Sequence, residues 1–213
     1  IRVKLLDLTA SARVGDELSF TVFSEHLFGK PAEGLLAEAE LTYAPCDFKP
    51  KAWDGFLFGD AAKNLTASTR KATRQTLGED GRAAFSVKAA VEGLPPARVR
   101  ATVQATVTET GGRTVSARQM VTLDPYPFYI GINSGEERVV RVGTPRKIAL
   151  AAVNPDGTRH VEKTPLDVRV ERVTWVSGLR KDPSGRYLWE SERVLTNVSE
   201  AKAETAAENT SFA

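Results

Sequence analysis

Residue types that carry out acid–base, nucleophilic or metal chemistry are scarce in this chain of 213 residues. It contains two histidines, His26 and His160, and a single cysteine, Cys46. A cysteine nucleophile needs a nearby base, and neither histidine has another ligand residue at metal-site spacing. The motifs of zinc proteases, serine hydrolases and nucleotide-binding loops are also missing. The sequence therefore predicts no catalytic residues, no metal site and no cofactor, and hence a protein that is not an enzyme.

For one group of three aromatic residues, the sequence is compatible with two different roles. Trp53, Phe56 and Phe58 lie among glycines and prolines, which predicts a loop or a short strand beside one. Their rings could form an exposed stacking platform that binds a sugar or a peptide. They could also cover a sheet edge or close one end of a domain. We favour packing because the three rings have no polar ligand groups around them, and we keep the binding site as the alternative.

The elements that must position these side chains are strands. Apolar and polar residues alternate over residues 99–107 and again over 115–123, which predicts half-buried antiparallel strands. Gly111 and Gly112 can both take positive φ, so the two strands are predicted to form a hairpin. The same alternation predicts further strands near residues 1–5, 18–22, 35–43 and 85–89. Roughly seven strands in the first part of the chain are the number expected of an immunoglobulin-type sandwich.

A proline-rich segment at residues 124–127 (DPYP) interrupts the alternation. Proline cannot donate a ladder hydrogen bond, so strand pairing is expected to stop there. We place a domain boundary at this point. The sequence thus predicts an all-β protein of two tandem immunoglobulin-like antiparallel sandwiches, one at residues 1–124 and the other at residues 125–213.

The second predicted domain has only about five strands, four of them near residues 140–142, 148–152, 166–175 and 187–195, with turns at 154–157 (NPDG) and 182–185 (DPSG). The alternation slips near Arg172 and Val173, which indicates a bulge or a change of sheet. Residues 199–213 are rich in Ala and Glu, and propensity alone predicts a helix or a tail. We expect this domain to be truncated, with its final strands beyond Ala213.

The balance of charged residues and the lack of long apolar runs indicate which kinds of binding partner are not expected. Lys and Arg number 29 against 27 Asp and Glu, a net charge of +2, so nothing favours nucleic acid or an anionic membrane as a partner. No run approaches the ~20 apolar residues of a spanning helix, so direct membrane insertion is not expected. The chain opens on Ile1 without a signal-peptide pattern, and we expect it to be a fragment of a longer protein whose targeting segment has been removed.

An ordered set of short motifs resembles the macroglobulin domains of bacterial α2-macroglobulin-like proteins. Residues 28–34 (FGKPAEG) are similar to a loop of those domains, and an alternating acidic strand follows, as it does there. Residues 55–59 (GFLFG) resemble the end of the next family segment. Residues 127–132 (PFYIGI) and the turn at 154–157 resemble the following macroglobulin domain. The resemblance implies two consecutive macroglobulin domains that precede the bait region.

This resemblance implies a function as non-catalytic scaffold domains of a protease inhibitor, a trap in which a bait segment is cut and the molecule collapses around the protease. The partners would be other domains of the same parent chain and, through the parent, target proteases. The parent would be periplasmic or at the cell surface, with a lipid anchor as one option. The thioester motif Cys-x-Glu-Gln of many members is absent, since Cys46 is followed by Asp47, Phe48 and Lys49. The rival hypothesis is an adhesin-like or carbohydrate-binding immunoglobulin-type module that uses Trp53, Phe56 and Phe58.

Overall fold

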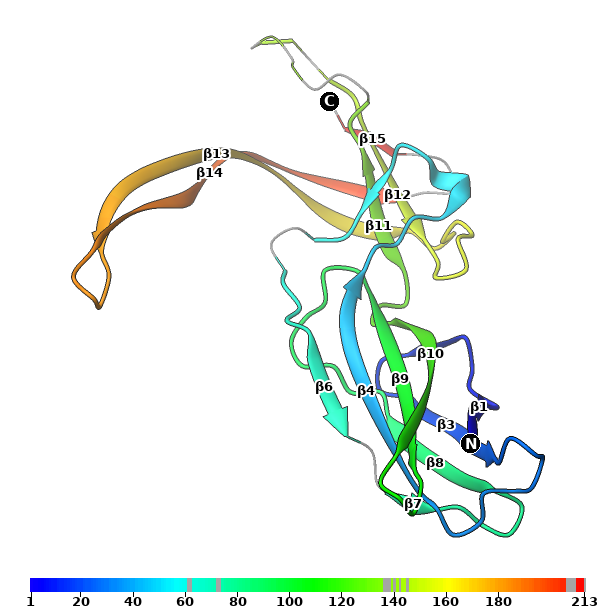
Figure 1. The fold of residues 1–213 in the computed structure, drawn as a ribbon. Coiled ribbons are helices and arrows are strands. Elements are labelled where there is room, and N and C mark those ends of the chain that lie inside the picture. Colours follow the sequence, from blue (N-terminus) through cyan, green and yellow to red (C-terminus); the bar gives the residue numbers. More distant parts are fainter. Residues whose placement is uncertain are drawn as a thin grey trace. The chain divides into compact units, whose positions relative to one another are not determined.

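The structure is a computed structural model that describes residues 1–60, 63–71, 74–135, 139, 141, 143–144, 146–205 and 210–212. These residues form strands and one short 3₁₀ helix, which confirms the predicted all-β class. The chain divides into two compact units (Figure 1), one made of residues 1–132 with 153–158 and the other of residues 133–152 with 159–213. The first unit therefore includes residues 125–132, beyond the boundary predicted after Asp124, and that boundary stays a proposal.

Two sheets build the first unit. The smaller sheet has the strand order β1 (Arg2–Leu6), β3 (Glu17–Glu25), β8 (Arg82–Lys88), with antiparallel neighbours throughout. The larger sheet has the order β2 (Ser11–Arg13), β10 (Thr114–Asp124), β9 (Arg98–Thr108), β4 (Leu36–Cys46), β6 (Ser68–Lys71), and β7 (Gln75–Thr76) also pairs with β4. Only the pairing of β2 with β10 is parallel among these strands.

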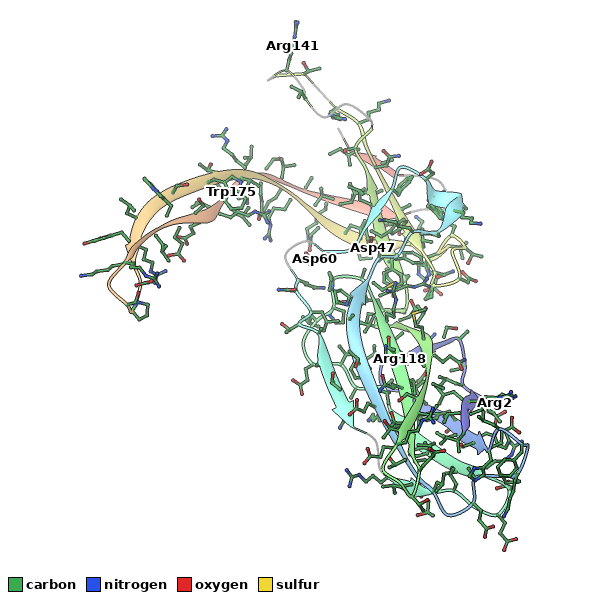
Figure 2. All side chains as sticks on the ribbon, in the orientation of Figure 1. Arg2, Asp47, Asp60, Arg118, Arg141 and Trp175 are labelled. Atoms are coloured by element: carbon green, nitrogen blue, oxygen red, sulfur yellow. The ribbon has the colours of Figure 1, made fainter. Side chains whose placement is uncertain are left out.

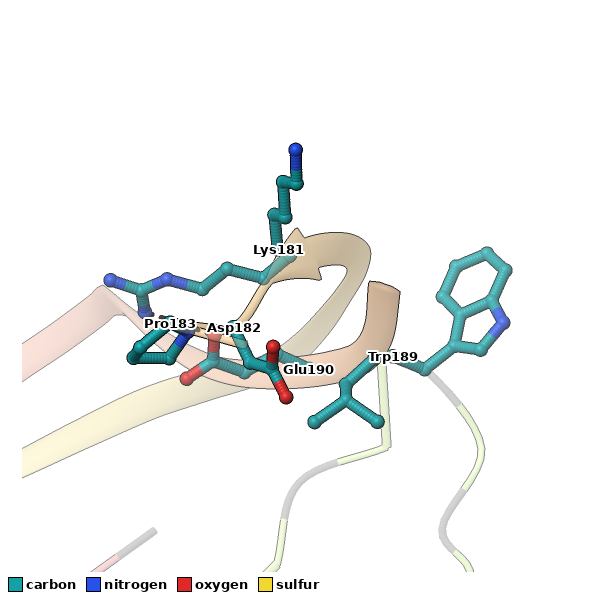
Figure 3. A pocket seen from close by; sticks show the side chains of 7 residues that line it. Lys181, Asp182, Pro183, Trp189 and Glu190 are labelled. Carbon is teal, nitrogen blue, oxygen red and sulfur yellow. Dashed lines mark hydrogen bonds and ion pairs between the residues drawn. The ribbon is translucent and has the colours of Figure 1, made fainter. Parts of the chain in front are cut away.

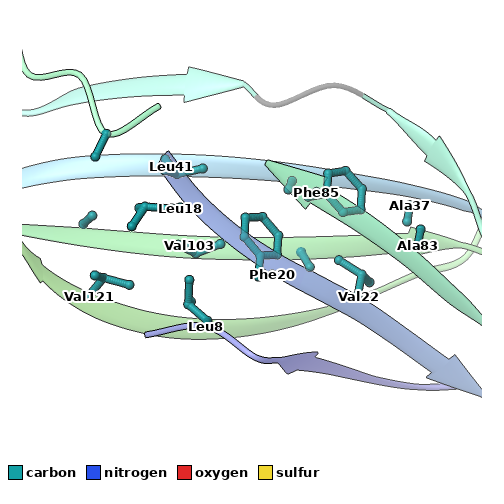
Figure 4. Close-up of a cluster of buried hydrophobic side chains, with 14 of the residues drawn as sticks. Leu8, Leu18, Phe20, Val22, Ala37, Leu41, Ala83, Phe85, Val103 and Val121 are labelled. Atoms are coloured by element: carbon teal, nitrogen blue, oxygen red, sulfur yellow. The ribbon is translucent and has the colours of Figure 1, made fainter. Parts of the chain in front are cut away.

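The core of the first unit lies between these sheets because the strands alternate buried and exposed residues. Phe20 of β3 stacks on Phe85 of β8 with ring centroids 5.5 Å apart. Leu41 of β4 and Val103 of β9 face them from the larger sheet and are fully buried (Figure 4). Period-two patterning thus gives each sheet one apolar face, and the two faces enclose a single core.

The hairpin of β9 and β10 is confirmed, and its turn differs in detail from the prediction. The Gly112 amide donates to the Glu109 carbonyl at 2.8 Å, and the Glu109 amide donates to the Arg113 carbonyl at 2.8 Å. Only Gly112 of the glycine pair has positive φ, at 81°. The turn is therefore the three-residue hairpin type that ends on one left-handed residue rather than a two-residue turn with positive φ at both positions.

Short elements close one end of the first unit. The 3₁₀ helix η1 (Lys51–Trp53) is followed by β5 (Leu57–Phe58), which pairs antiparallel with β11 (Tyr129–Asn133), Phe58 opposite Gly131. The turn at residues 154–157 belongs to the same unit. Its Gly157 amide donates to the Asn154 carbonyl at 2.9 Å, as the predicted turn requires.

The second unit contains a long two-stranded ribbon. β13 (Thr164–Lys181) and β14 (Tyr187–Thr205) pair antiparallel along their whole length, and the predicted turn at residues 182–185 joins them. The register shifts between Val170 and Glu171, close to the predicted slip at Arg172 and Val173. The helix or tail predicted from residue 199 is wrong as far as Thr205, because pairing with residues 164–170 fixes this segment as strand despite its helical propensity.

The remaining described strands of the second unit are β12 (Ile148–Val153) and β15 (Thr210–Phe212), which pair antiparallel. The strand predicted at residues 140–142 falls on Val140 and Val142, which lie outside the described residues. Side chains over residues 171–181 and 187–197 of the ribbon, Trp175 among them, are open to solvent (Figure 2).

Candidate functional site

An aromatic stack fills the end of the first unit where β5 and β11 pair. The rings of Phe48, which follows β4, and Tyr129 of β11 stack with centroids 4.4 Å apart, and both side chains are buried. Phe58 of β5 meets Phe48 edge-on at 5.0 Å. A Cβ atom at Gly131 would lie 2.5 Å from Phe58 Cε1. Glycine is therefore required at position 131 so that the Phe58 ring can lie across the neighbouring strand.

A buried ion pair lies against this aromatic stack. Arg98 begins β9 and Asp124 ends β10, and the Arg98 Nε donates to Asp124 Oδ1 at 2.7 Å. The Asp124 carboxylate is only 8% exposed and also accepts from the Tyr129 hydroxyl at 2.7 Å. The Arg98 guanidinium lies 4.4 Å from the Phe48 ring centroid and donates through Nη2 to the Pro155 carbonyl. One guanidinium thus joins β10, the aromatic stack and the turn at 154–157.

The electrostatics of this cluster favour a fixed hydrogen-bond donor over a reactive group. Burial raises the pKa of the Tyr129 hydroxyl, and its hydrogen bond to the Asp124 carboxylate raises that pKa further. Tyr129 therefore stays protonated, so that its hydroxyl can donate to the carboxylate. An arginine paired with a carboxylate and stacked on a ring is suited to holding segments together.

The predicted binding residues Trp53, Phe56 and Phe58 are brought together beside this cluster. Trp53 and Phe56 meet edge-on at 5.3 Å, and Phe56 lies 6.3 Å from Phe58. The Trp53 Nε1 donates to the Gly157 carbonyl at 2.9 Å. All three side chains are half-buried. The geometry favours the packing interpretation, because the rings contact one another and the indole N–H already has an acceptor. The binding platform stays a prediction.

Sequence reasoning missed Arg98, Asp124 and Tyr129 as a group. A usable signal existed in the hairpin register, in which Thr108 lies opposite Thr114 and Val99 opposite Leu123. One further step away from the turn brings Arg98 and Asp124 opposite each other, an opposite-charge cross-strand pair. No comparable signal links this pair with Pro155, which lies 57 residues from Arg98 along the chain.

The other residues considered for chemistry have structural partners. His26 stacks on Phe28 at 5.3 Å in the loop that follows β3. The Cys46 Sγ donates weakly to the Asp47 carbonyl and accepts from Arg100, both at 3.7 Å. In the part of the chain that the structure describes, no three His, Cys, Asp or Glu side chains form a group that could hold a metal ion. No described helix is long and apolar enough to cross a membrane.

Comparison with protein families gives a match over the first unit. The family model described as "Bacterial Alpha-2-macroglobulin MG5 domain" matches residues 1–125. Curated relatives extend the similarity. An alpha-2-macroglobulin of Pasteurella multocida is 25% identical over 203 residues, which cover 92% of this chain and 10% of the relative. The Escherichia coli alpha-2-macroglobulin is 31% identical over 118 residues, which cover 55% of this chain and 7% of that protein.

Solved structures are similar over the whole chain. The native conformation of E. coli alpha-2-macroglobulin covers 100% of this chain with a TM-score of 0.70 at 20% identity, and 14% of that structure is matched. Salmonella alpha-2-macroglobulin reacted with methylamine covers 99% with a TM-score of 0.71, and E. coli alpha-2-macroglobulin activated by porcine elastase covers 99% with 0.66. The chain spans about a tenth of the length of the P. multocida relative. At this identity the structural likeness establishes the fold alone.

Proposed function

Because this chain belongs to the bacterial alpha-2-macroglobulin family through the MG5 domain at its residues 1–125, we propose that it is a non-catalytic scaffold segment of a longer protease inhibitor. The match to the MG5 domain carries the proposal. Its activity would be that of the parent, a trap whose bait segment is cut by a protease and which then collapses around it.

The packing of the first unit supports a scaffold role. In a trap of this kind, whole domains change their arrangement after cleavage, so each domain must keep its own fold. β4, β9 and β10 are each 11 residues long and enclose a core in which Leu41, Val103 and Val121 are fully buried. At one end, the Arg98–Asp124 pair joins two of these strands to the turn at 154–157. Such an end resists local opening because the buried Asp124 carboxylate accepts hydrogen bonds from both Arg98 and the Tyr129 hydroxyl.

The partners follow from the parent. We propose that the chain contacts other domains of the same polypeptide and meets target proteases only through the assembled inhibitor. We further propose a periplasmic or cell-surface location for that inhibitor, with a lipid anchor as one way of holding it there. Mass spectrometry of the mature parent's N-terminal peptide, after fractionation of periplasm and membranes, tests both the location and the anchor.

The function is tested on the full-length parent with porcine elastase as the probe. We expect elastase to cut the parent first outside this 213-residue segment. After this cut, the elastase should lose activity on a large protein substrate while it still cleaves a small chromogenic peptide. Elastase inactivated with an active-site reagent is the control and should leave the parent uncut. First cleavage within the segment, or undiminished cleavage of the protein substrate, would contradict the proposal.

The alternative is a carbohydrate-binding or adhesin-like module that uses Trp53, Phe56 and Phe58. Titration of the 213-residue chain with glycans, followed by the fluorescence of Trp53 in a Trp175→Phe, Trp189→Phe background, tests it directly. A saturable shift that Phe56→Ala abolishes would favour the binding module. An unchanged spectrum would remove it.

A further inference from the structure

The outer part of the ribbon has one markedly aromatic face. We call residues 171–181 of β13 and 187–197 of β14 the distal arm. Opposite residues of an antiparallel pair share a face, and the register places Val173 opposite Leu195 and Leu179 opposite Trp189. Trp175 and Tyr187 lie on the same face, two residues along each strand. Trp175, Tyr187 and Trp189 are 64%, 67% and 73% exposed.

The other face of the distal arm has no aromatic residue, and its exposed apolar residues are the aliphatic Val176, Leu188 and Val194. It carries Glu190 and Glu192, and the Arg180 Nη1 donates to Glu190 Oε2 at 2.9 Å. Figure 3 shows Trp189 projecting away from Asp182, Pro183 and Glu190 at the tip. The distal arm thus exposes its aromatic residues on one face only, and exposed apolar patches of this kind mark interaction surfaces.

The bulge explains why this patch is separate from the packing of the ribbon's base. In the base, Leu166 lies opposite Ala203 and Val168 opposite Ala201, and these four side chains are half-buried. On β13 this half-buried side of the base uses the even-numbered positions Leu166 and Val168, whereas the aromatic face of the distal arm uses odd-numbered positions. The apolar side of the ribbon therefore changes at the register shift between Val170 and Glu171. The surface that buries the aromatic face of the distal arm must therefore differ from the one that packs on the apolar side of the base.

The charged residues on the aromatic face indicate which groups a surface that binds it should carry. Arg193 lies opposite Trp175, and Lys181 lies opposite Tyr187 with its Nζ 5.9 Å from the ring centroid. The one acidic residue of this face, Glu171, lies at the bulge end of the arm. A complementary surface is therefore apolar at its centre and acidic at its edge.

The size of the face distinguishes a contact within one chain from a contact between chains. Eleven residues at about 3.3 Å each and two strands about 4.8 Å apart give a footprint of roughly 35 Å by 10 Å. Docking would thus bury on the order of 700 Å² in total. That lies within the roughly 600–1,500 Å² of contacts between domains of one chain, and below the roughly 1,200 Å² that stable contacts between separate proteins need.

We propose that the aromatic face of the distal arm docks on an apolar, acid-rimmed surface of another domain of the same parent polypeptide. The inference rests on the proposed function, because it takes the parent to be a multidomain inhibitor. The curated relatives support this source, since the P. multocida relative that covers 92% of the chain is matched over only 10% of its own length. Covalent linkage in one polypeptide gives a small interface a high effective concentration.

The test places a photocrosslinking amino acid in the full-length parent. Trp189→p-benzoylphenylalanine probes the aromatic face, and Glu190→p-benzoylphenylalanine is the matched control on the opposite face of the same strand. We expect irradiation of the first variant to give an intramolecular crosslink, mapped by mass spectrometry to an acidic segment of another domain, at several-fold higher yield than the control. The double reversal Lys181→Glu, Arg193→Glu should lower that yield.

Three outcomes would overturn the proposal. The first is equal crosslinking from the two positions, which would mean that the aromatic face stays in solvent. The second is a crosslink between two copies of the parent, and the third is a yield unchanged by the charge reversal. The elastase assay on the same variants separates this inference from the proposed function. Retained inhibition without a crosslink refutes only the docking, whereas lack of inhibition by the unmodified parent refutes the function.

Discussion

Replacing Asp124 with alanine should weaken the first unit far more than the removal of an exposed charge. The carboxylate is 8% exposed and accepts from Arg98 and Tyr129, each at 2.7 Å. Removal of one partner from a buried ion pair costs about 3–5 kcal/mol. Arg98 is 21% exposed in its side chain and keeps the Pro155 carbonyl as an acceptor, so the lower end applies. We expect Asp124→Ala to lower the free energy of unfolding by about 3 kcal/mol.

Urea unfolding followed by Trp53 fluorescence measures this loss. Trp53 lies in the first unit, and Trp175→Phe with Trp189→Phe removes the signal of the ribbon. Asp47→Ala is the matched control. Asp47 also pairs with a cation at 2.7 Å, Lys49, but this pair is about three-quarters exposed, and exposed pairs contribute little. We expect no measurable change from the control.

A loss of stability from Asp124→Ala no larger than that from Asp47→Ala would contradict this prediction. Such a result would mean that water reaches the Arg98 guanidinium and replaces the carboxylate, so that the end of the sandwich is not closed by the ion pair. A loss that persists undiminished in an Arg98→Met background would also contradict it. In a coupled pair the second removal must cost less than the first.

Three further predictions concern the same end of the first unit. Gly131→Ala should lower the free energy of unfolding by about 1–3 kcal/mol because its Cβ overlaps the Phe58 ring. Urea unfolding of the same substitution in a Phe58→Leu background tests this overlap, since the further loss of stability should be smaller there. Tyr129 has a pKa raised above its ordinary value of 10.0, so its contribution to stability is complete below about pH 10 and declines above it, where the unfolded chain ionises first. Tyr129→Phe should flatten this alkaline decline in unfolding curves from pH 8 to 11, and an unchanged slope would contradict the assignment. Trp53→Phe should cost about 1 kcal/mol through loss of the hydrogen bond to Gly157, and no change in the urea midpoint would show that this bond adds nothing.

The sequence was sufficient for features that depend on neighbours in the chain. Alternation over residues 99–107 and 115–123 predicted β9 and β10, and the break in alternation near Arg172 predicted the bulge two residues away. These features follow from local pattern because a strand's side chains alternate faces wherever one face is buried.

Features set by distant partners were not predicted. Residues 199–205 have the composition of a helix, yet they pair with residues 164–170 across the ribbon. The contact of Arg98 with the Pro155 carbonyl joins positions 57 residues apart, and the Trp53 bond to Gly157 spans 104 residues. No periodicity encodes such contacts, because they depend on how the closed sandwich brings its loops together.

Arginine suits position 98 because three different groups contact this one side chain. Pro155 presents a carbonyl, Asp124 presents a carboxylate, and Phe48 presents the face of its ring, all to one side chain. Lysine has a single nitrogen that cannot reach two separated acceptors and also lie flat on a ring, whereas the planar guanidinium donates in several directions. An apolar residue would pack on Phe48 but remove the Arg98 donor from the Pro155 carbonyl and leave the buried Asp124 carboxylate with no cation beside it, only the Tyr129 hydroxyl as a donor. The same arginine that pairs with Asp124 of β10 therefore also holds the turn at 154–157, so that one side chain joins two segments of the first unit that lie far apart in the sequence.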